Sequence, residues 1–387
     1  MYKSVKNGLE LKYNICKMNH FFKNIVILCV TGLCGNFVYA QQLKPVQDSI
    51  LFYLIKVAGR EIKDFKTNNR NIPETDWQNA VLYAGIVSVE KIDNDKKYND
   101  LLYGIGTGNN WNTGPHRFFA DDYCIAQMYT QLYMQCQDQK MIAKWKELAD
   151  SIVVHRFEEP LKVVPGLNYR EWAWCDALFM GPPGLAYLST ALNDNKYLMK
   201  ADSLWWKTTE YLYDTTEHLF YRDSRFFDRK EGNDKKIFWS RGNGWVMAGL
   251  VRMLENMPAY FSHRKKYIML LRQMGDKVIR LQQPDGSWHA SLLDPGSYKE
   301  KETSGTALFC YALAWGIDHG ILSKKKYLPS VEKAWSALIA AVHSDGTLGY
   351  VQKVGDKPTA TDYNSTGAYG VGTFLLAGSE IYKLNKN

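Results

Sequence analysis

The sequence of 387 residues has few cysteines and none of the residue spacings that indicate a metal or nucleotide site. Four of its seven cysteines follow residue 40, namely Cys124, Cys136, Cys175 and Cys310. They lie in apolar segments without framework spacing, so we expect buried thiols rather than disulfides. No group of Cys and His has metal-ligand spacing, and the sequence contains no glycine-rich loop of the P-loop or dinucleotide type. The sequence therefore offers no metal site and argues against the common nucleotide-binding classes.

The chain also lacks a run of basic residues. Its formal net charge is +8, but residues 1–40 contribute a net +4 through five lysines and one glutamate. The remaining charges alternate in sign along the chain, which argues against nucleic-acid binding. A mildly basic protein rich in Trp and Tyr is compatible with an acidic sugar as its ligand.

A long hydrophobic run is missing as well. The apolar run Ile25–Val30 is short and is soon followed by glycines, which argues against a retained membrane helix. It follows lysines and precedes the small-residue segment Val38–Ala40, which is the arrangement of an export signal and its cleavage site. We therefore predict a signal peptide with a preceding extension over residues 1–40. The mature chain, residues 41–387, is expected in the periplasm or the medium, free of the membrane.

A sixfold repeat is the main feature that the sequence does contain. Each repeat has a short polar segment followed by a long helix of small and aromatic residues, and several of these helices lack a polar face, so they should be buried all round. The six segments begin near Asn79, Asp121, Asp176, Asn243, Ser304 and Ser365.

Four of these segments are followed by a Lys-Tyr pair that leads into an amphipathic helix. Six buried helices that alternate with six amphipathic ones predict an all-α fold, the (α/α)6 barrel, as a single domain over residues 41–387. The first helix, Val46–Phe65, is expected to pair with the sixth repeat and to close the ring. An open α-solenoid is the alternative. The pairs are Lys97-Tyr98, Lys196-Tyr197, Lys266-Tyr267 and Lys326-Tyr327.

The segment Trp172–Pro183 places one acid, Asp176, between two tryptophans and an apolar run. Desolvation of a carboxylate is costly and raises its pKa, which suits a group that carries a proton near neutral pH. The alternative is that Asp176 simply caps the helix that follows.

The starts of the other repeats carry further polar and aromatic residues, and these starts should meet at one end of the barrel. Asp122 is a candidate carboxylate or a helix cap, and its neighbour Asp121 is expected to be structural. Arg241 is expected to meet a carboxylate of the protein or of a ligand. Together with the walls formed by tryptophans such as Trp77 and Trp245, the composition is that of a carbohydrate site.

The chain resembles the unsaturated glucuronyl and rhamnogalacturonyl hydrolases, glycoside hydrolase families 88 and 105, and family 105 more closely. The likeness covers nearly the whole mature chain, and its strongest pieces are three motifs whose order and spacing fit the six repeats. The motifs are Trp174-Cys175-Asp176-Ala177-Leu178-Phe179-Met180, Arg241-Gly242-Asn243-Gly244-Trp245 and Glu302-Thr303-Ser304-Gly305-Thr306-Ala307.

The resemblance implies an (α/α)6 barrel without metal or organic cofactor. It implies a substrate partner made by polysaccharide lyases, an oligosaccharide with a 4,5-unsaturated uronic acid at its non-reducing end. Such enzymes hydrate the C4=C5 enol ether and then release the next sugar. The position that matches the general acid/base is Asp176, and the one that matches the second carboxylate is Asp122. The expected substrate-binding residues are Trp174, Arg241, Asn243, Trp245, Arg222, Thr303 and Trp77.

One departure from family 105 concerns Arg222, which follows Leu219-Phe220-Tyr221 where the family often has a histidine. Arg222 could clamp the substrate carboxylate in a bidentate way, which we prefer, or could pair with Asp223 or Asp228.

Two other functions stay open at this point. A conventional inverting glycosidase could use Asp176 and Asp122, with a separation of about 6.5–9.5 Å between the two carboxyl groups. A non-catalytic glycan-binding protein is the second. A sugar epimerase is argued against, because it would need paired histidines, which the sequence does not offer. A monomer or a weak homodimer is expected.

Overall fold

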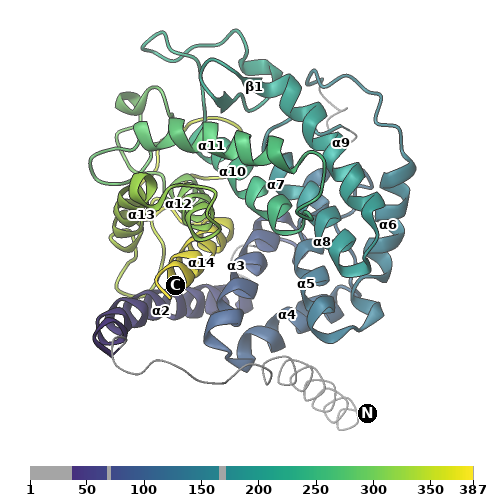
Figure 1. Cartoon of the computed structure of the whole chain (residues 1–387), viewed down its shortest axis with the longest axis horizontal. Coiled ribbons are helices and arrows are strands. Elements are labelled where there is room, and N and C mark those ends of the chain that lie inside the picture. The colour runs from purple at the N-terminus through teal and green to yellow at the C-terminus, as the bar shows by residue number, and fades with distance from the viewer. Residues whose placement is uncertain (1–36, 68–70, 165–170, 387) are drawn as a thin grey trace.

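The computed structural model describes residues 37–67, 71–164 and 171–386, and these residues form a ring of paired helices (Figure 1). Most of the predicted signal peptide and extension, residues 1–36, lies outside the described residues. The expected cleavage point after Ala40 falls in the first turn of α2 (Phe37–Lys66). None of the helices that the structure describes is long and apolar enough to cross a membrane.

The inner wall of the ring consists of helices that are buried on nearly every side, as the sequence predicts. In α12, for example, every residue from Thr303 to Ile317 is buried. The inner helices are α3 (Trp77–Asp93), α5 (Ala126–Cys136), α7 (Ala177–Met180) continued by α8 (Pro182–Leu192), α10 (Ser240–Glu255), α12 (Thr303–Asp318) and α14 (Ala368–Leu384).

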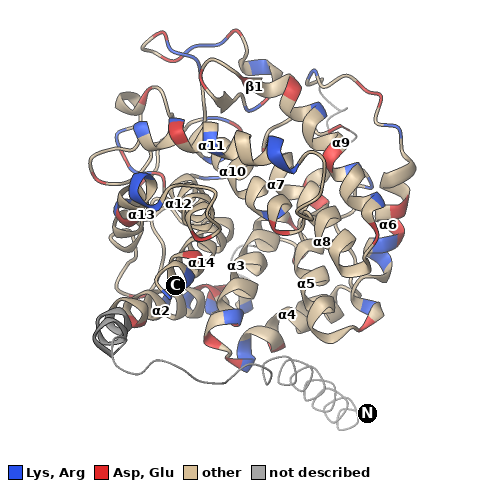
Figure 2. Ribbon diagram, in the orientation of Figure 1, with Lys and Arg blue, Asp and Glu red and all other residues tan. Residues whose placement is uncertain are grey.

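The outer helices carry many more charged side chains than the inner helices, which are largely uncharged (Figure 2). The four Lys-Tyr pairs lie in the first turns of outer helices, where the tyrosine is buried and the lysine is not. Tyr197, for example, donates its hydroxyl to Asp150 at 2.7 Å while Lys196 lies over its ring. The outer helices are α4 (Lys96–Gly108), α6 (Ala143–Val154), α9 (Asn195–Leu212), α11 (Arg264–Arg280), α13 (Lys324–Ile339) and α2.

The ring is closed, because the last inner helix α14 packs against both α3 and α2. The contact between α14 and α3 is close enough to require glycine. A Cβ at Gly372 would lie 2.3 Å from the carbonyl oxygen of Val81, and one at Gly85 would lie 2.5 Å from that of Gly372. The closure confirms the (α/α)6 barrel and excludes the open solenoid.

Short elements fill the connections between the helices. The strands β1 (Tyr213–Asp214) and β2 (Leu219–Phe220) pair antiparallel between α9 and α10. The 3-10 helices are η1 (Ala120–Tyr123), η2 (Gln139–Met141), η3 (Ser224–Phe226) and η4 (Pro295–Ser297).

The cysteines follow the sequence prediction with one exception. Cys124, Cys175 and Cys310 are free and buried. The prediction was wrong for Cys136, which is half-buried at the end of α5 and is disulfide-bonded.

Candidate active site

Asp176 lies at the start of α7, and the third inner position of the ring is divided there into two helices, α7 and α8. Gly181 and the following prolines end α7 and start α8, and a Cβ at Gly181 would lie 2.8 Å from the Trp172 ring. Asp176 itself has helical dihedral angles, and its side chain makes no capping hydrogen bond. The structure therefore excludes the helix-cap alternative and leaves the carboxyl group for other contacts.

The surroundings of Asp176 combine burial with one close cation. Asp176 as a whole residue is 8% exposed, and its Oδ2 lies 3.3 Å from Nε of Arg222 and 3.6 Å from the Cys175 thiol. Burial raises the pKa of the Asp176 carboxyl, and the positive charges of Arg222 and Arg241 oppose that shift. Asp176 is thus a buried acid whose proton affinity depends on its arginine neighbours.

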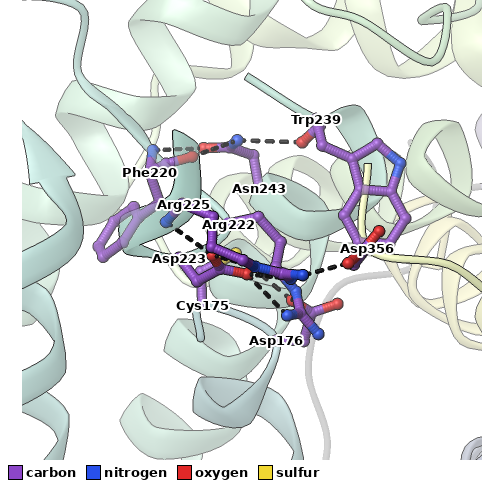
Figure 3. Close-up of polar contacts among 9 residues, drawn as sticks. All are labelled: Cys175, Asp176, Phe220, Arg222, Asp223, Arg225, Trp239, Asn243 and Asp356. Atoms are coloured by element: carbon purple, nitrogen blue, oxygen red, sulfur yellow. Dashed lines mark hydrogen bonds and ion pairs between the residues drawn. The ribbon is translucent and has the colours of Figure 1, made fainter. Parts of the chain in front are cut away.

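Backbone pairing brings Arg222 to Asp176. The amide of Cys175 donates to the carbonyl of Arg222 at 2.9 Å, and Trp174 forms an antiparallel bridge with Asp223. The Arg222 guanidinium then contacts two carboxylates, Asp176 through Nε and Asp223 through Nη1 at 2.8 Å (Figure 3). Of the partners that the sequence allowed, the structure shows Asp223, and it adds Asp176.

The negative charge of Asp176 affects the pKa of Asp121 rather than that of Asp122. One oxygen of Asp121, Oδ1, is buried and has no hydrogen-bond partner among the described residues. Burial, together with the negative charges of Asp176 and Asp122, raises the pKa of Asp121 to about 8, against the effect of Arg222.

Asp122 instead holds a loop. Its Oδ2 accepts from the backbone amide of His116 at 2.5 Å and lies 3.1 Å from Nδ1 of that residue. A Cβ at Gly114 would lie 2.3 Å from Cγ of Asp122, so the loop packs directly on the carboxyl. Burial raises the pKa of Asp122, and the charges that act on it are those of His116 and Asp76 rather than Asp176. The structure therefore gives Asp122 a contact with His116, and the role of Asp122 as the second carboxylate stays a prediction.

Arg241 fixes a distant segment to the site. Its Nη1 donates to the carbonyl of Gln352 at 2.5 Å, and its Nη2 donates to that of Lys353 at 2.9 Å. The guanidinium is buried and lies over the rings of Trp239 and Tyr369. The hydrogen bonds of Arg241 go to backbone carbonyls rather than to a carboxylate of the described residues, although its charge acts on Asp176. Its contact with a ligand carboxylate stays a prediction.

Two further residues of the expected substrate-binding set are engaged with the backbone. Asn243 accepts from the amide of Phe220 at 2.7 Å and donates to its carbonyl at 3.0 Å, which holds β2 against α10. Thr303 is buried, and its hydroxyl donates to the carbonyl of Gly349 at 2.8 Å. Both side chains therefore position backbone segments around the site.

The tryptophans belong to two aromatic groups, both mostly buried, which we call the aromatic wall. Trp245 is 1% exposed and packs against Phe179 and the partly buried Trp77. Trp174 is buried against Phe119, with 5.3 Å between ring centroids. Of these rings Trp77 is the most accessible, whereas Trp245 belongs to the core.

Sequence reasoning missed a group of charged residues beside Arg222. Asp223 is fully buried and also binds Arg225, which reaches Asp356 on a segment far along the chain. Asp223 was noticed only as a surface partner for Arg222. No sequence signal pointed to Asp356, because its contact joins positions 131 residues apart.

The ring of helix pairs, with two buried carboxyls, an arginine and aromatic rings at one end, is the architecture of a carbohydrate-cleaving enzyme. The sequence model of Glycosyl Hydrolase Family 88 matches residues 53–385, and the chain belongs to that family. It is therefore a glycoside hydrolase, as the sequence motifs indicated.

Two named relatives support this membership. An unsaturated 3S-rhamnoglycuronyl hydrolase from Formosa agariphila is 39% identical over 326 residues, which cover 81% of this chain and 85% of that protein. A protein of the same name from an Alteromonas species is 34% identical over 328 residues, which cover 80% and 78%.

Solved structures agree on the fold. A glycosyl hydrolase family 88 structure from Bacteroides vulgatus superposes with a TM-score of 0.78 and 31% identity, and covers 87% of this chain and 99% of that one. An unsaturated glucuronyl hydrolase from a Bacillus species superposes with a TM-score of 0.60 at 14% identity over 86% and 96% of the two chains, which is a likeness of fold alone.

Proposed function

We propose that this enzyme releases a terminal 4,5-unsaturated uronic acid from lyase-generated oligosaccharides, in the manner of family 105. The observation that carries the proposal is Asp176, a buried and uncapped carboxyl with a single arginine at ion-pair distance. Such a group can hold a proton near neutral pH and give it to a substrate that enters the aromatic-walled end of the ring.

In the proposed reaction, Asp176 protonates C4 of the enol ether and water adds at C5. The resulting hemiketal opens and expels the next sugar. Asp176 then recovers a proton from the attacking water, so one side chain serves as acid and base. The buried site strengthens these charge effects because little water screens them.

Asp121 takes the second carboxyl role that we first expected of Asp122. Since Asp121 and Asp176 repel each other when both are ionised, the pair retains one proton to a higher pH than an isolated aspartate does. That retained proton is the one that Asp176 delivers. Asp122 instead accepts a hydrogen bond from the backbone amide of His116 and fixes the loop that carries this residue.

Arg222 acts on Asp176 in this proposal rather than on the substrate carboxylate. Its guanidinium is already bound by Asp223 on one side and lies against Asp176 on another. A bidentate clamp on the substrate would require Arg222 to leave one of these carboxylates. Trp77 remains the better candidate for contact with a sugar ring, because it is only partly buried.

We infer that a rhamnosyl residue with a 3-sulfate follows the unsaturated uronate. Support comes from the names of the two relatives that are 39% and 34% identical to this chain. A more distant relative, 23% identical, is an unsaturated rhamnogalacturonyl hydrolase from Bacillus subtilis, which makes unsulfated pectic oligosaccharides the second candidate.

The test follows the ultraviolet absorbance of the conjugated uronate, with sulfated and desulfated rhamnose-containing oligosaccharides and with pectic and glycosaminoglycan lyase products. Loss of absorbance on the sulfated substrate, absent in Asp176→Asn, is the expected result. Sugar release without loss of absorbance would instead indicate a conventional inverting glycosidase.

We infer that the protein is exported to the periplasm or the medium as a monomer or weak homodimer. The support is the signal-like pattern of residues 1–40. N-terminal sequencing of the protein from its host should find a start near Gln41, and light scattering should give a mass near that of one chain. A retained N-terminus would contradict export by this route.

A further inference from the structure

A line of alternating charges connects the surface to Asp176. Asp356 accepts from Nη2 of Arg225 at 2.7 Å, and Arg225 binds Asp223 through Nε at 2.9 Å and Nη2 at 2.7 Å. Asp223 in turn accepts from Nη1 of Arg222 at 2.8 Å, and Nε of Arg222 lies 3.3 Å from Asp176. Figure 3 shows the five side chains in contact one after another.

Asp223 is the centre of this line, and its burial makes its partners indispensable. Its side chain has no exposed surface, whereas that of Arg222 is 21% exposed and those of Arg225 and Asp356 are 39% exposed. Burial opposes ionisation of Asp223, but hydrogen bonds from Arg225 and Arg222 hold its pKa below the usual range. A buried carboxylate that lost one of these arginines would draw more strongly on the other.

The two arginines compete for the same oxygen. Nη1 of Arg222 and Nη2 of Arg225 both bind Oδ2 of Asp223, at 2.8 and 2.7 Å. Arg222 therefore interacts with both Asp223 and Asp176. The stronger the ion pair between Arg225 and Asp223, the more freely Arg222 can interact with Asp176.

Among the charged groups that act on Asp176, Arg222 is the one whose position depends on a second carboxylate, Asp223. The other groups are Arg241, whose guanidinium is fixed by backbone carbonyls, the Cys175 thiol and the carboxyl of Asp121. Only Arg222 reaches Asp176 at ion-pair distance among the residues that the structure describes.

We propose that Asp223 and Arg225 are positioning residues that set how strongly Arg222 holds the Asp176 carboxylate. The proposal rests on the proposed function, since it takes Asp176 as the acid. Asp223 and Arg225 touch no substrate in this scheme and act through Arg222. Asp356, at the exposed end of the line, competes with Asp223 for Arg225 and so affects how strongly Asp223 binds Arg222.

The proposal predicts shifts of opposite sign in the basic limb of the pH profile of kcat/KM, where activity falls as Asp176 loses its proton. In Arg225→Gln, Asp223 loses a cation and pulls Arg222 from Asp176, which then keeps its proton to a higher pH. In Asp223→Asn, Arg222 turns to Asp176 and stabilises the carboxylate, so the limb moves to lower pH. We expect shifts of about one pH unit.

Two surface variants refine the test. Asp356→Asn leaves Arg225 entirely to Asp223, releases Arg222 toward Asp176 and should move the limb to lower pH by a smaller amount. Its matched control is Asp234→Asn, which removes an exposed carboxylate that pairs with Lys230 and should leave the limb in place. Arg225→Lys keeps the cation and should restore most of the wild-type profile.

The experiment measures these profiles on the sulfated oligosaccharide for each purified variant, with thermal unfolding alongside. Opposite shifts in Arg225→Gln and Asp223→Asn support the proposal. If Asp223→Asn does not fold, opposite shifts in Arg225→Gln and Asp356→Asn support it equally. Lower melting temperatures with an unmoved limb would overturn it and leave a purely structural network. Activity that persists in Asp176→Asn would instead refute the proposed function itself.

Discussion

Asp121 and Asp122 are adjacent in sequence but lie in different surroundings, and on this difference we base the proposal that Asp121 acts with Asp176. Both belong to the short 3-10 helix η1, whose tight turn sends consecutive side chains in different directions. The negative charge of Asp176 raises the pKa of Asp121, whereas the Asp122 carboxylate contacts the backbone amide and the ring of His116. The sequence alone does not show these contacts, and from it we expected Asp122 to be the second carboxylate and Asp121 to be structural.

Removal of the acid function at Asp176 is the first prediction at this scale. Asp176→Asn keeps the shape of the side chain but cannot donate a proton, so kcat should fall by about 10²–10⁴-fold, the usual contribution of general acid–base catalysis. The measurement is the rate of loss of uronate absorbance at saturating substrate. Binding of the oligosaccharide by calorimetry should persist. A variant with near wild-type kcat would remove Asp176 from the mechanism.

The two neighbouring acids give a second, paired prediction. In Asp121→Asn the negative neighbour of Asp176 is gone, so Asp176 ionises more easily and the basic limb of kcat/KM should move to lower pH by about one unit. Asp122→Asn removes an acid that does not interact with Asp176, so its limb should stay in place while the loop that carries His116 loosens. The pH profiles of both variants provide the comparison, and a shift in Asp122→Asn alone would restore our original assignment.

At the scale of elements, sequence pattern predicted the helices well but did not predict the hydrogen-bond partners of their first residues. Burial and periodicity along one segment are local properties, so the alternation of buried and amphipathic helices could be predicted. The partners of Asn243 and Arg241 are not local, because they lie on β2 and on the segment at Gln352 and Lys353. The structure therefore shows backbone contacts of these motif residues that the sequence did not indicate, and their expected contact with sugar stays a prediction.

A substitution at Asn243 can distinguish a role in holding the backbone from a role in binding the substrate. Asn243→Ala leaves the buried amide and carbonyl of Phe220 unpaired, at a cost of about 1–3 kcal/mol for each group. We expect a clearly lower free energy of unfolding in chemical denaturation, with a reduced kcat because β2 precedes Arg222. A direct role in substrate binding would give the contrary pattern, a raised KM with unchanged stability.

At the scale of the whole molecule, the repeat made the ring predictable, but the closure depends on contacts that only the folded chain shows. The first and last inner helices, α3 and α14, come from opposite ends of the chain and meet through Gly85 and Gly372. These helices also carry Trp77 and Tyr369, whose rings are 5.1 Å apart at the active end. Closure of the ring and assembly of the aromatic wall are thus the same event.

Gly372→Ala should therefore damage both stability and activity. The added methyl group would meet the backbone of Val81 at about the 2.3 Å given for an ideal Cβ, and backbone cannot move aside as a side chain can. Overpacking of this kind costs about 1–3 kcal/mol, although alanine is intrinsically the better helix former. The matched control is Gly104→Ala in α4, where nothing lies within 4 Å of the added Cβ, so stability should rise by up to about 1 kcal/mol. Thermal unfolding of the two variants, together with kcat/KM, measures the contrast. If both substitutions stabilised the protein equally, the close approach of α3 and α14 would not be a constraint on the ring, and the aromatic wall would have to be positioned by other contacts.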